Sequence, residues 1–164
     1  MVSPPPAGVY VPVPTFFVSK KAANYNPIAA PLDLETQAAH SIHLAKSGIT
    51  GLVVLGSTGE AVHLSNKERF EVLSAVRKAY DGAGYKDYPL IAGTASQNIE
   101  EVVEQLVSAK EAGVQWGLCL VPGYFAGASS QAGIIEWFKA VADRSPIPVM
   151  MYVSLSSPTK ITRK

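Results

Sequence analysis

The sequence predicts a parallel α/β fold, and three observations support that prediction. Short apolar runs alternate with longer segments of helical periodicity between residues 9 and 152. Each run and the helix after it take about 30 residues, the length of a right-handed βαβ unit. The later runs are apolar throughout, which is typical of strands covered on both faces. The predicted strands span residues 9–17, 51–55, 88–92, 116–121 and 148–152.

Helix signals occupy the segments between these runs. Asp33 has the type and position of an N-cap, and Gly48 has those of a C-terminal stop. Ser65 and Glu68 have the spacing of a capping box, which predicts a helix that follows directly. Ser129 or Ser130 opens the last helix. The predicted core faces are Leu34, Ala38, Ile42 and Ala45 in the first helix, Ile99, Val102, Val103, Leu106 and Val107 in the third, and Ile134, Trp137, Phe138 and Val141 in the fourth.

Composition narrows the class of protein. The 164 residues are 48% hydrophobic and 16% charged, which predicts one globular domain with a core. A formal net charge of +1 predicts neither nucleic acid nor a membrane surface as a partner. The only cysteine, Cys119, lies in an apolar run, so we expect its side chain to be buried. A single cysteine cannot form an intramolecular disulfide, which predicts a reducing compartment. With a proline-rich start that lacks signal-peptide features, the expected localisation is cytoplasmic.

A doubly wound open sheet and a (β/α)8 barrel both fit the alternation of strands and helices. No G-x-G-x-x-G motif follows the first predicted strand, which counts against a dinucleotide-binding sheet. A barrel needs eight strands and about 250 residues. Chain length taken alone therefore favours the open sheet.

Polar side chains follow the predicted strands where parallel α/β folds bind ligands, at the carboxyl ends. The turn at residues 56–60 offers backbone N–H groups and the hydroxyls of Ser57 and Thr58 to an anion. Tyr124 follows the fourth strand and Tyr152 ends the fifth, and a phenol can donate or accept a proton. Spacing alone leaves open an ordinary capped turn and two packing tyrosines.

The sequence predicts no metal site and no cofactor. His40 and His43 lie three residues apart on one predicted helix, a spacing that two metal ligands can use. No third ligand accompanies them, so we expect solvated helix residues. We expect His63 to be a surface or packing residue, and Glu60 to hold the turn by accepting from backbone N–H groups.

Several segments resemble the dihydrodipicolinate synthase / N-acetylneuraminate lyase superfamily, whose members are class I pyruvate aldolases. Residues 56–60, Gly-Ser-Thr-Gly-Glu, resemble its G-[TS]-[TS]-G-E motif, and residues 121–125 resemble its T-P-Y-Y segment. Residues 148–152 resemble the strand that normally continues as Y-N-x-P. The resemblance covers residues 9–152. Within the superfamily, these motif sequences are most similar to those of the fungal L-threo-3-deoxy-hexulosonate (2-keto-3-deoxy-L-galactonate) aldolases.

The resemblance implies a (β/α)8 barrel, of which this chain holds about the first five strands, against the argument from length. It implies a sixth-strand lysine that forms a Schiff base with a 2-oxo acid substrate whose carboxylate is held by Ser57 and Thr58. It assigns general acid/base catalysis to Tyr152 and a proton relay across a dimer interface to Tyr124, in a homo-oligomer that is a dimer or a tetramer. Gly123 departs from the pattern, since many members have a second tyrosine there.

The expected organisation is a flexible lead-in over residues 1–8, a partial aldolase barrel over 9–152 and a tail outside the family pattern over 153–164. The implied reaction is retro-aldol cleavage of a 3-deoxy-2-oxo sugar acid to pyruvate and L-glyceraldehyde. We expect no lysine at the end of a buried strand, and therefore an inactive chain. Homologues of dihydrodipicolinate synthase or 4-hydroxy-2-oxoglutarate aldolase stay open. So do two non-enzymes: a truncated splice or gene-model product that self-associates, and an open-sheet binder of small anions.

Overall fold

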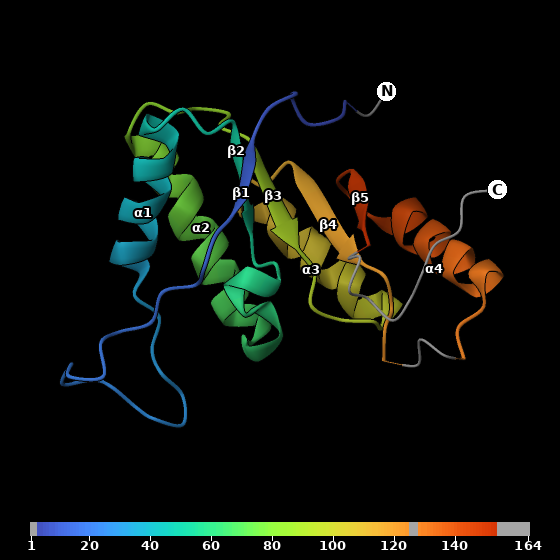
Figure 1. The fold of residues 1–164 in the computed structure, drawn as a ribbon, viewed down its shortest axis with the longest axis horizontal. Coiled ribbons are helices and arrows are strands. Elements are labelled where there is room, and N and C mark those ends of the chain that lie inside the picture. The colour runs from blue at the N-terminus through green and yellow to red at the C-terminus, as the bar shows by residue number, and fades with distance from the viewer. Residues whose placement is uncertain (1–2, 125–127, 154–164) are drawn as a thin grey trace.

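A computed structural model describes residues 3–124 and 128–153, in which strands and helices alternate (Figure 1). Most of the expected tail, residues 154–164, lies outside the described residues, as do residues 1–2. The strands are β1 Tyr10–Pro12, β2 Gly51–Val54, β3 Leu90–Gly93, β4 Trp116–Leu120 and β5 Val149–Tyr152. The helices are α1 Leu34–Lys46, α2 Asn66–Gly82, α3 Ile99–Glu111 and α4 Gln131–Arg144, and two short 3-10 turns, η1 Ser57–Gly59 and η2 Ala61–His63, follow β2.

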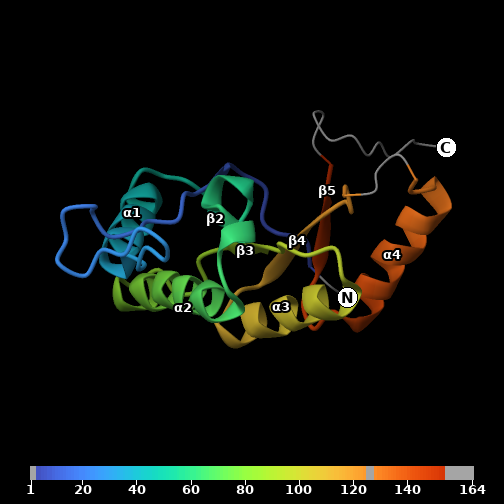
Figure 2. The same ribbon diagram turned by 90° about the horizontal axis from the view of Figure 1, so that it is seen from below.

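The strands form one parallel sheet in the order β1-β2-β3-β4-β5. When every crossover is right-handed, an order that never reverses places all the helices on the same face. Figure 2 shows α1 to α4 along the outer side of the arc of strands. A doubly wound sheet reverses its order and carries helices on both faces. The open sheet favoured by chain length is therefore wrong, and the fold is an arc of a (β/α)8 barrel.

The first strand is much shorter than the expected run over residues 9–17. Pro12 and Pro14 lack the N–H that a ladder needs, so regular pairing ends after three residues. The chain still follows β2, since the N–H of Val13 donates to the carbonyl of Val53 at 3.0 Å. Thr15 is buried and its hydroxyl donates to the carbonyl of Gly59 at 2.7 Å. The segment after β1 is thereby tied to the turn after β2.

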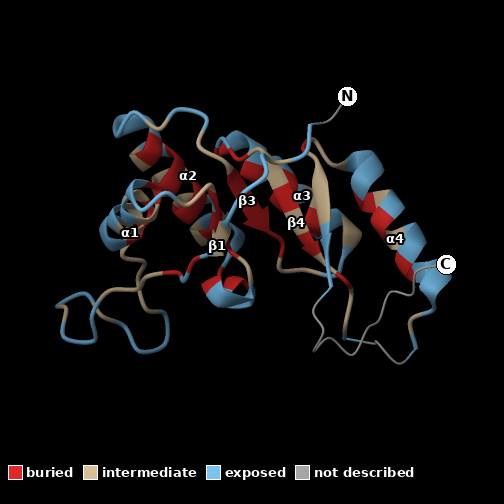
Figure 3. Cartoon of the chain, turned by 45° about the horizontal axis from the view of Figure 1, so that its top comes forward, coloured by how far each residue is buried: buried red, intermediate tan, exposed pale blue. Residues whose placement is uncertain are grey.

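The core lies between the sheet and the inner faces of the helices (Figure 3). Strands β2 and β3 are largely buried on both faces, as expected. Strand β5 corrects that expectation, because Met151 is 62% and Tyr152 43% exposed. The reason is position: β5 is the last strand of the sheet within the described residues, so only β4 covers it laterally.

The expected core face of α3 is partly wrong. Val107 is 41% exposed, and Gln105 is buried in its place beside Val102 and Leu106. A buried amide is tolerated when its polar atoms are hydrogen-bonded. Here the Gln105 side-chain oxygen accepts from the N–H of Ala95 at 2.9 Å, and its amide donates to Asn66 at 3.2 Å.

The capping box at the start of α2 is confirmed. The N–H of Glu68 donates to the Ser65 hydroxyl oxygen at 3.3 Å, and the N–H of Ser65 donates to the Glu68 carboxylate at 2.9 Å. The hydrogen bonds from Ser65 lower the pKa of Glu68. A carboxyl whose pKa is lowered by folding stabilises the fold above its ordinary titration range. That contribution is lost as pH falls through the lower folded-state pKa.

We expect Glu68→Ala to lower the free energy of unfolding by about 1 kcal/mol at pH 7, the usual size of a cap. The loss should be smaller in acid below the lowered folded-state pKa of Glu68, where the wild-type carboxyl is protonated as well. Urea unfolding at both pH values measures the difference. Glu71→Ala is the control, because Glu71 on the same helix has only a surface ion pair with Lys67. An equal loss for Glu68→Ala at both pH values would contradict the assignment.

Candidate functional site

The turn between β2 and α2 presents four hydrogen-bond donors. Within η1 the N–H of Gly59 donates to the carbonyl of Gly56 at 3.0 Å, and that of Glu60 donates to the carbonyl of Ser57 at 3.1 Å. The N–H groups of Ser57 and Thr58 precede these bonds and reach no protein acceptor within residues 3–124 and 128–153. Their two exposed hydroxyls have no protein partner there either. Such a cluster of donors at the start of a helical turn favours an anion.

Glu60 supports this turn differently from what its sequence position predicts. Its carboxylate accepts from no backbone N–H of the described chain, so the expected hydrogen bonds are wrong. Its backbone holds the turn instead: φ is 52°, in the left-handed region, and this residue joins η1 to η2. Leu55, with φ 63°, makes the corresponding bend at the end of β2.

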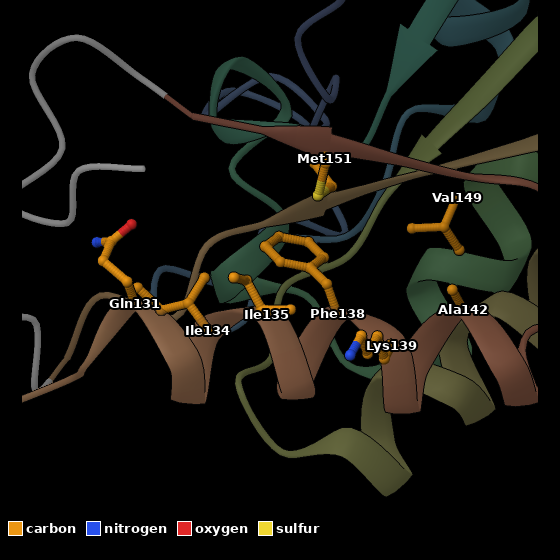
Figure 4. A pocket seen from close by; sticks show the side chains of 8 residues that line it. All are labelled: Gln131, Ile134, Ile135, Phe138, Lys139, Ala142, Val149 and Met151. Atoms are coloured by element: carbon orange, nitrogen blue, oxygen red, sulfur yellow. The ribbon is translucent and has the colours of Figure 1, made fainter. Parts of the chain in front are cut away.

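A cavity of about 200 Å³ brings Ser57, Thr58 and Tyr152 together. The remaining lining is apolar or glycine: Pro12, Val53, Gly56, Gly93, Leu118 and Leu120. Tyr152 reaches this side of the sheet because side chains alternate along β5, and those of Val149 and Met151 point toward α4 (Figure 4). A hydroxyl-and-amide turn and a phenol therefore face one small space at the carboxyl ends of the strands.

Gly93 forms part of this cavity and admits no side chain. A Cβ atom there would lie 2.3 Å from the carbonyl oxygen of Leu55 and 2.8 Å from its carbonyl carbon. Backbone atoms cannot swing aside as a flexible side chain does. The end of β3 can therefore approach the bend after β2 only because residue 93 is glycine.

Arg69 also connects the end of β3 with the turn that follows β2. It is buried on α2, and its guanidinium donates to the carbonyl of Gly93 at 2.5 Å and to that of Ala61 at 3.4 Å. Burial lowers the pKa of Arg69 to about 10, and the charge of Glu101 opposes that shift. The side chain stays cationic at neutral pH. Sequence reasoning assigned no role to Arg69, since no local pattern shows which distant carbonyls it reaches.

Tyr124 lies apart from the cavity. It is 79% exposed on the loop after β4, and it does not line the space shared by Ser57 and Tyr152. Gln97, in the loop after β3, holds this segment: its side-chain oxygen accepts from the N–H groups of Gly123 and Tyr124, each at 2.9 Å. The indole N–H of Trp137 donates to the backbone carbonyl of Gln97 at 2.9 Å. Sequence reasoning missed Gln97, which reads as part of an ordinary loop before a helix.

We expect Gln97→Ala to expose the Gly123 and Tyr124 amides to solvent. Losing an acceptor worth about 1 kcal/mol per bond predicts roughly fivefold faster hydrogen exchange at both amides. Amide exchange followed by NMR measures the change. Gln97→Glu keeps an acceptor oxygen and serves as the control, so protection should persist. Unchanged exchange in Gln97→Ala would show that other contacts hold the loop.

Glu60, His63 and Thr94 line a neighbouring cavity of about 160 Å³ together with Ser57. His40 packs against Phe16, with ring centroids 5.2 Å apart. Within residues 3–124 and 128–153 there is no group of three or more His, Cys, Asp or Glu side chains that could hold a metal ion. Cys119 is buried, as predicted, and burial raises the pKa of its thiol. None of the described helices is both long enough and apolar enough to cross a membrane.

The fold and the cavity define the class: a singly wound arc of a (β/α)8 barrel with a small cavity, lined by Ser57, Thr58 and Tyr152, at the carboxyl ends of its strands. A family model, the dihydrodipicolinate synthetase family, matches residues 26–160. The chain belongs to this family. Membership confirms the resemblance in the motifs, and the solved relatives below confirm the partial barrel.

Curated relatives carry aldolase names. The chain is 39% identical over 153 residues to the L-threo-3-deoxy-hexylosonate aldolase of Hypocrea jecorina, covering 92% of this chain and 46% of that protein. It is 41% identical over 145 residues to the probable 4-hydroxy-2-oxoglutarate aldolase, mitochondrial, of Emericella nidulans, covering 88% and 44%. The chain thus spans about half the length of the curated relatives it matches.

Solved structures agree on the fold. A dihydrodipicolinate synthase family protein from Coccidioides immitis superposes with a TM-score of 0.79 at 34% identity, covering 95% of this chain and 47% of that one. A prophage protein of the same family from E. coli K12, solved in complex with pyruvate, gives a TM-score of 0.75 at 27% identity, covering 92% and 46%. Both matches place the described sheet within a larger family structure.

Proposed function

We propose that this chain forms the carboxylate-binding and proton-transferring part of a Schiff-base aldolase for a 3-deoxy-2-oxo sugar acid. The observation that carries the proposal is the cavity shared by Ser57, Thr58 and Tyr152. The aldolase names of the Hypocrea jecorina and Aspergillus niger relatives, 39% and 40% identical to this chain, support the substrate class. We also propose a small-molecule substrate, no nucleic-acid or membrane partner, and action in the cytoplasm.

Each side chain has a role in this proposal. The N–H and hydroxyl groups of Ser57 and Thr58 bind the substrate carboxylate, which places the 2-oxo carbon over the cavity. In a retro-aldol step the C4 hydroxyl loses its proton and the C3–C4 bond breaks. The electron pair of that bond passes to the iminium that a lysine forms with C2, which releases the aldehyde and leaves an enamine. Protonation of the enamine at C3 and hydrolysis of the imine by water then give pyruvate and the free lysine. Tyr152 accepts and returns the proton. Tyr124 joins the relay in a homo-oligomer, where a neighbouring copy supplies it.

The chain by itself lacks a suitably placed amine within its described residues. No lysine of residues 3–124 and 128–153 lines the cavity. We therefore propose that the chain binds the 2-oxo acid and does not cleave it. A 4-hydroxy-2-oxoglutarate aldolase or a dihydrodipicolinate synthase would use the same carboxylate turn, so binding alone does not choose among the three substrates.

Calorimetry with pyruvate tests the carboxylate turn. We expect the double variant Ser57→Ala/Thr58→Val to bind pyruvate about tenfold more weakly, because hydrogen bonds to a charged group contribute roughly 1.5–3 kcal/mol. Ser74→Ala, on the outer surface of α2, is the matched control. Pyruvamide, which lacks the carboxylate, should not compete. Equal affinity of wild type and the double variant would remove the turn from the site.

A further inference from the structure

The buried hydroxyl of Thr15 holds the turn that presents the donors of Ser57 and Thr58. Thr15 is 7% exposed, and its hydroxyl donates to the carbonyl of Gly59 at 2.7 Å. Within residues 3–124 and 128–153 no other donor reaches that carbonyl. A carbonyl left unpaired in the interior costs free energy, so this bond favours the orientation of the Gly59–Glu60 peptide that reaches Thr15.

The orientation of that peptide sets the direction of the donors. The N–H of Gly59 donates to the carbonyl of Gly56 at 3.0 Å, which closes the turn around the two donor residues between them. On its other side the peptide joins Glu60, whose φ of 52° lies in the left-handed region that a residue with a side chain rarely adopts. Without the bond from Thr15 the peptide can rotate and relieve this φ. Such a rotation would turn the donors away from the cavity.

A second buried side chain anchors Thr15 to helix α1. Gln37 is 1% exposed, and its side-chain oxygen accepts from the N–H of Phe16 at 3.1 Å, which belongs to the Thr15–Phe16 peptide. The Phe16 carbonyl accepts from the N–H of Asp33 at 2.8 Å. The amide nitrogen of Gln37 is buried and has no acceptor in the described part of the chain. Burial of an unpaired amide nitrogen costs free energy, so an apolar residue would be more stable here unless the oxygen is needed.

We propose that Thr15 and Gln37 are positioning residues for the carboxylate turn, a role that rests on the proposed function of that turn. Neither side chain lines the cavity that Ser57 and Thr58 share, so neither touches the substrate. Gln37 fixes the backbone of Thr15, and Thr15 fixes the carbonyl of Gly59. The turn then directs its N–H and hydroxyl groups at one carboxylate. The affinity for a 2-oxo acid therefore depends on a buried chain of hydrogen bonds that begins on α1.

Calorimetry with pyruvate on the full 164-residue chain tests the role of Thr15. Thr15→Val keeps the shape of the side chain and removes the hydroxyl. We expect it to bind pyruvate about fivefold more weakly, the size expected for one lost hydrogen bond. Thr15→Ser keeps the hydroxyl and should bind as wild type does. Ser41→Ala is the matched control, because Ser41 is buried on α1 and its hydroxyl donates to the carbonyl of Gln37 at 2.8 Å. That bond does not lead to the turn, so its loss should lower stability and leave the affinity unchanged.

Gln37→Met tests the second residue, because it removes the acceptor for the Phe16 N–H at a similar side-chain length. We expect weaker pyruvate binding here too. If Gln37 acts through Thr15, the double variant Thr15→Val/Gln37→Met binds no more weakly than Thr15→Val alone. Losses that add in the double variant would show that Gln37 acts by another route, and its part of the proposal would be wrong. Where Thr15→Val does not fold, Gln37→Met carries the same test one bond further from the turn.

The amide NMR resonances of Ser57 and Thr58 judge the positioning without any ligand. We expect Thr15→Val to shift both resonances, and Thr15→Ser and Ser41→Ala to leave them in place. If wild type does not bind pyruvate, the proposed function fails and these spectra still decide the positioning. If wild type binds, and Thr15→Val binds equally well or Ser41→Ala loses as much affinity, the positioning role is overturned and the proposed function stands. Thermal unfolding of each variant establishes that the fold persists at the temperature of the comparison.

Discussion

Incubated with pyruvate and borohydride, the 164-residue chain by itself is expected to trap no pyruvate. Trapping requires a deprotonated amine that adds to the 2-oxo carbon. The adduct loses water to form an imine, and borohydride reduces the imine to a stable secondary amine. Ten lysines occur in the chain, and the eight that precede residue 153 lie on helices or loops away from the cavity. These eight are Lys20, Lys21, Lys46, Lys67, Lys78, Lys86, Lys110 and Lys139. Lys160 and Lys164 lie outside the described residues.

Intact-mass measurement followed by peptide mapping decides the outcome. The full-length Hypocrea jecorina aldolase, treated in parallel, is the positive control and should gain one adduct per chain. An adduct on one lysine of the short chain, absent when pyruvamide replaces pyruvate, would sink the prediction and place the electrophile-forming amine within these 164 residues. A retro-aldol assay with a 3-deoxy-2-oxo sugar acid extends the test to turnover.

Gly93→Val is expected to have the largest effect on stability. Its Cβ would lie 2.3 Å from the Leu55 carbonyl oxygen, and β2 and β3 would have to separate at the point where the turn begins. Overpacking typically costs about 1–3 kcal/mol, and a clash with the backbone of Leu55 and Gly56 belongs at or above the top of that range. We expect the variant to lose cooperative unfolding or to unfold at a much lower temperature.

Thermal and urea unfolding of Gly93→Ala and Gly93→Val measure the effect. Gly82→Ala is the matched control, because a Cβ at the end of α2 meets nothing within 4 Å. Alanine there should be neutral or stabilise by up to about 1 kcal/mol. If Gly93→Ala unfolds like wild type, the close approach of Leu55 and Gly93 is not a constraint on the fold, and the cavity wall can move.

Elements whose signals are local were predicted well. Asp33 caps α1 by accepting from the N–H of Thr36 at 2.9 Å, and Ser130 caps α4. Such bonds join residues three positions apart, so the sequence contains both partners side by side. Helix faces were predicted less well where a polar residue is buried. Gln105 is buried, where its side-chain oxygen accepts from the N–H of Ala95, while Val107 is partly exposed. Hydropathy does not indicate such a hydrogen bond.

The candidate site divides in the same way. The turn with Ser57 and Thr58 was found from its residue types, and Tyr152 from its place at a strand end. Sequence reasoning did not identify the roles of the two side chains that hold the segments around the cavity in place. Arg69 reaches Gly93, 24 positions along the chain, and Gln97 reaches Gly123, 26 positions along. Side chains that bond backbone carbonyls or N–H groups at such distances leave no periodic or spacing signal.

The sequence by itself determined the alternation of strands and helices, their caps, and the polar groups that follow each strand, because these depend on neighbours in the chain. The tertiary structure decided between the open sheet that chain length favoured and the barrel that the motif resemblance implied, since strand order is set by which apolar faces pack. It alone placed Tyr152 in one cavity with Ser57 and Thr58, and left Tyr124 outside it. It also decided how far Met151 and Tyr152 on β5 are exposed, because exposure depends on what packs around a strand.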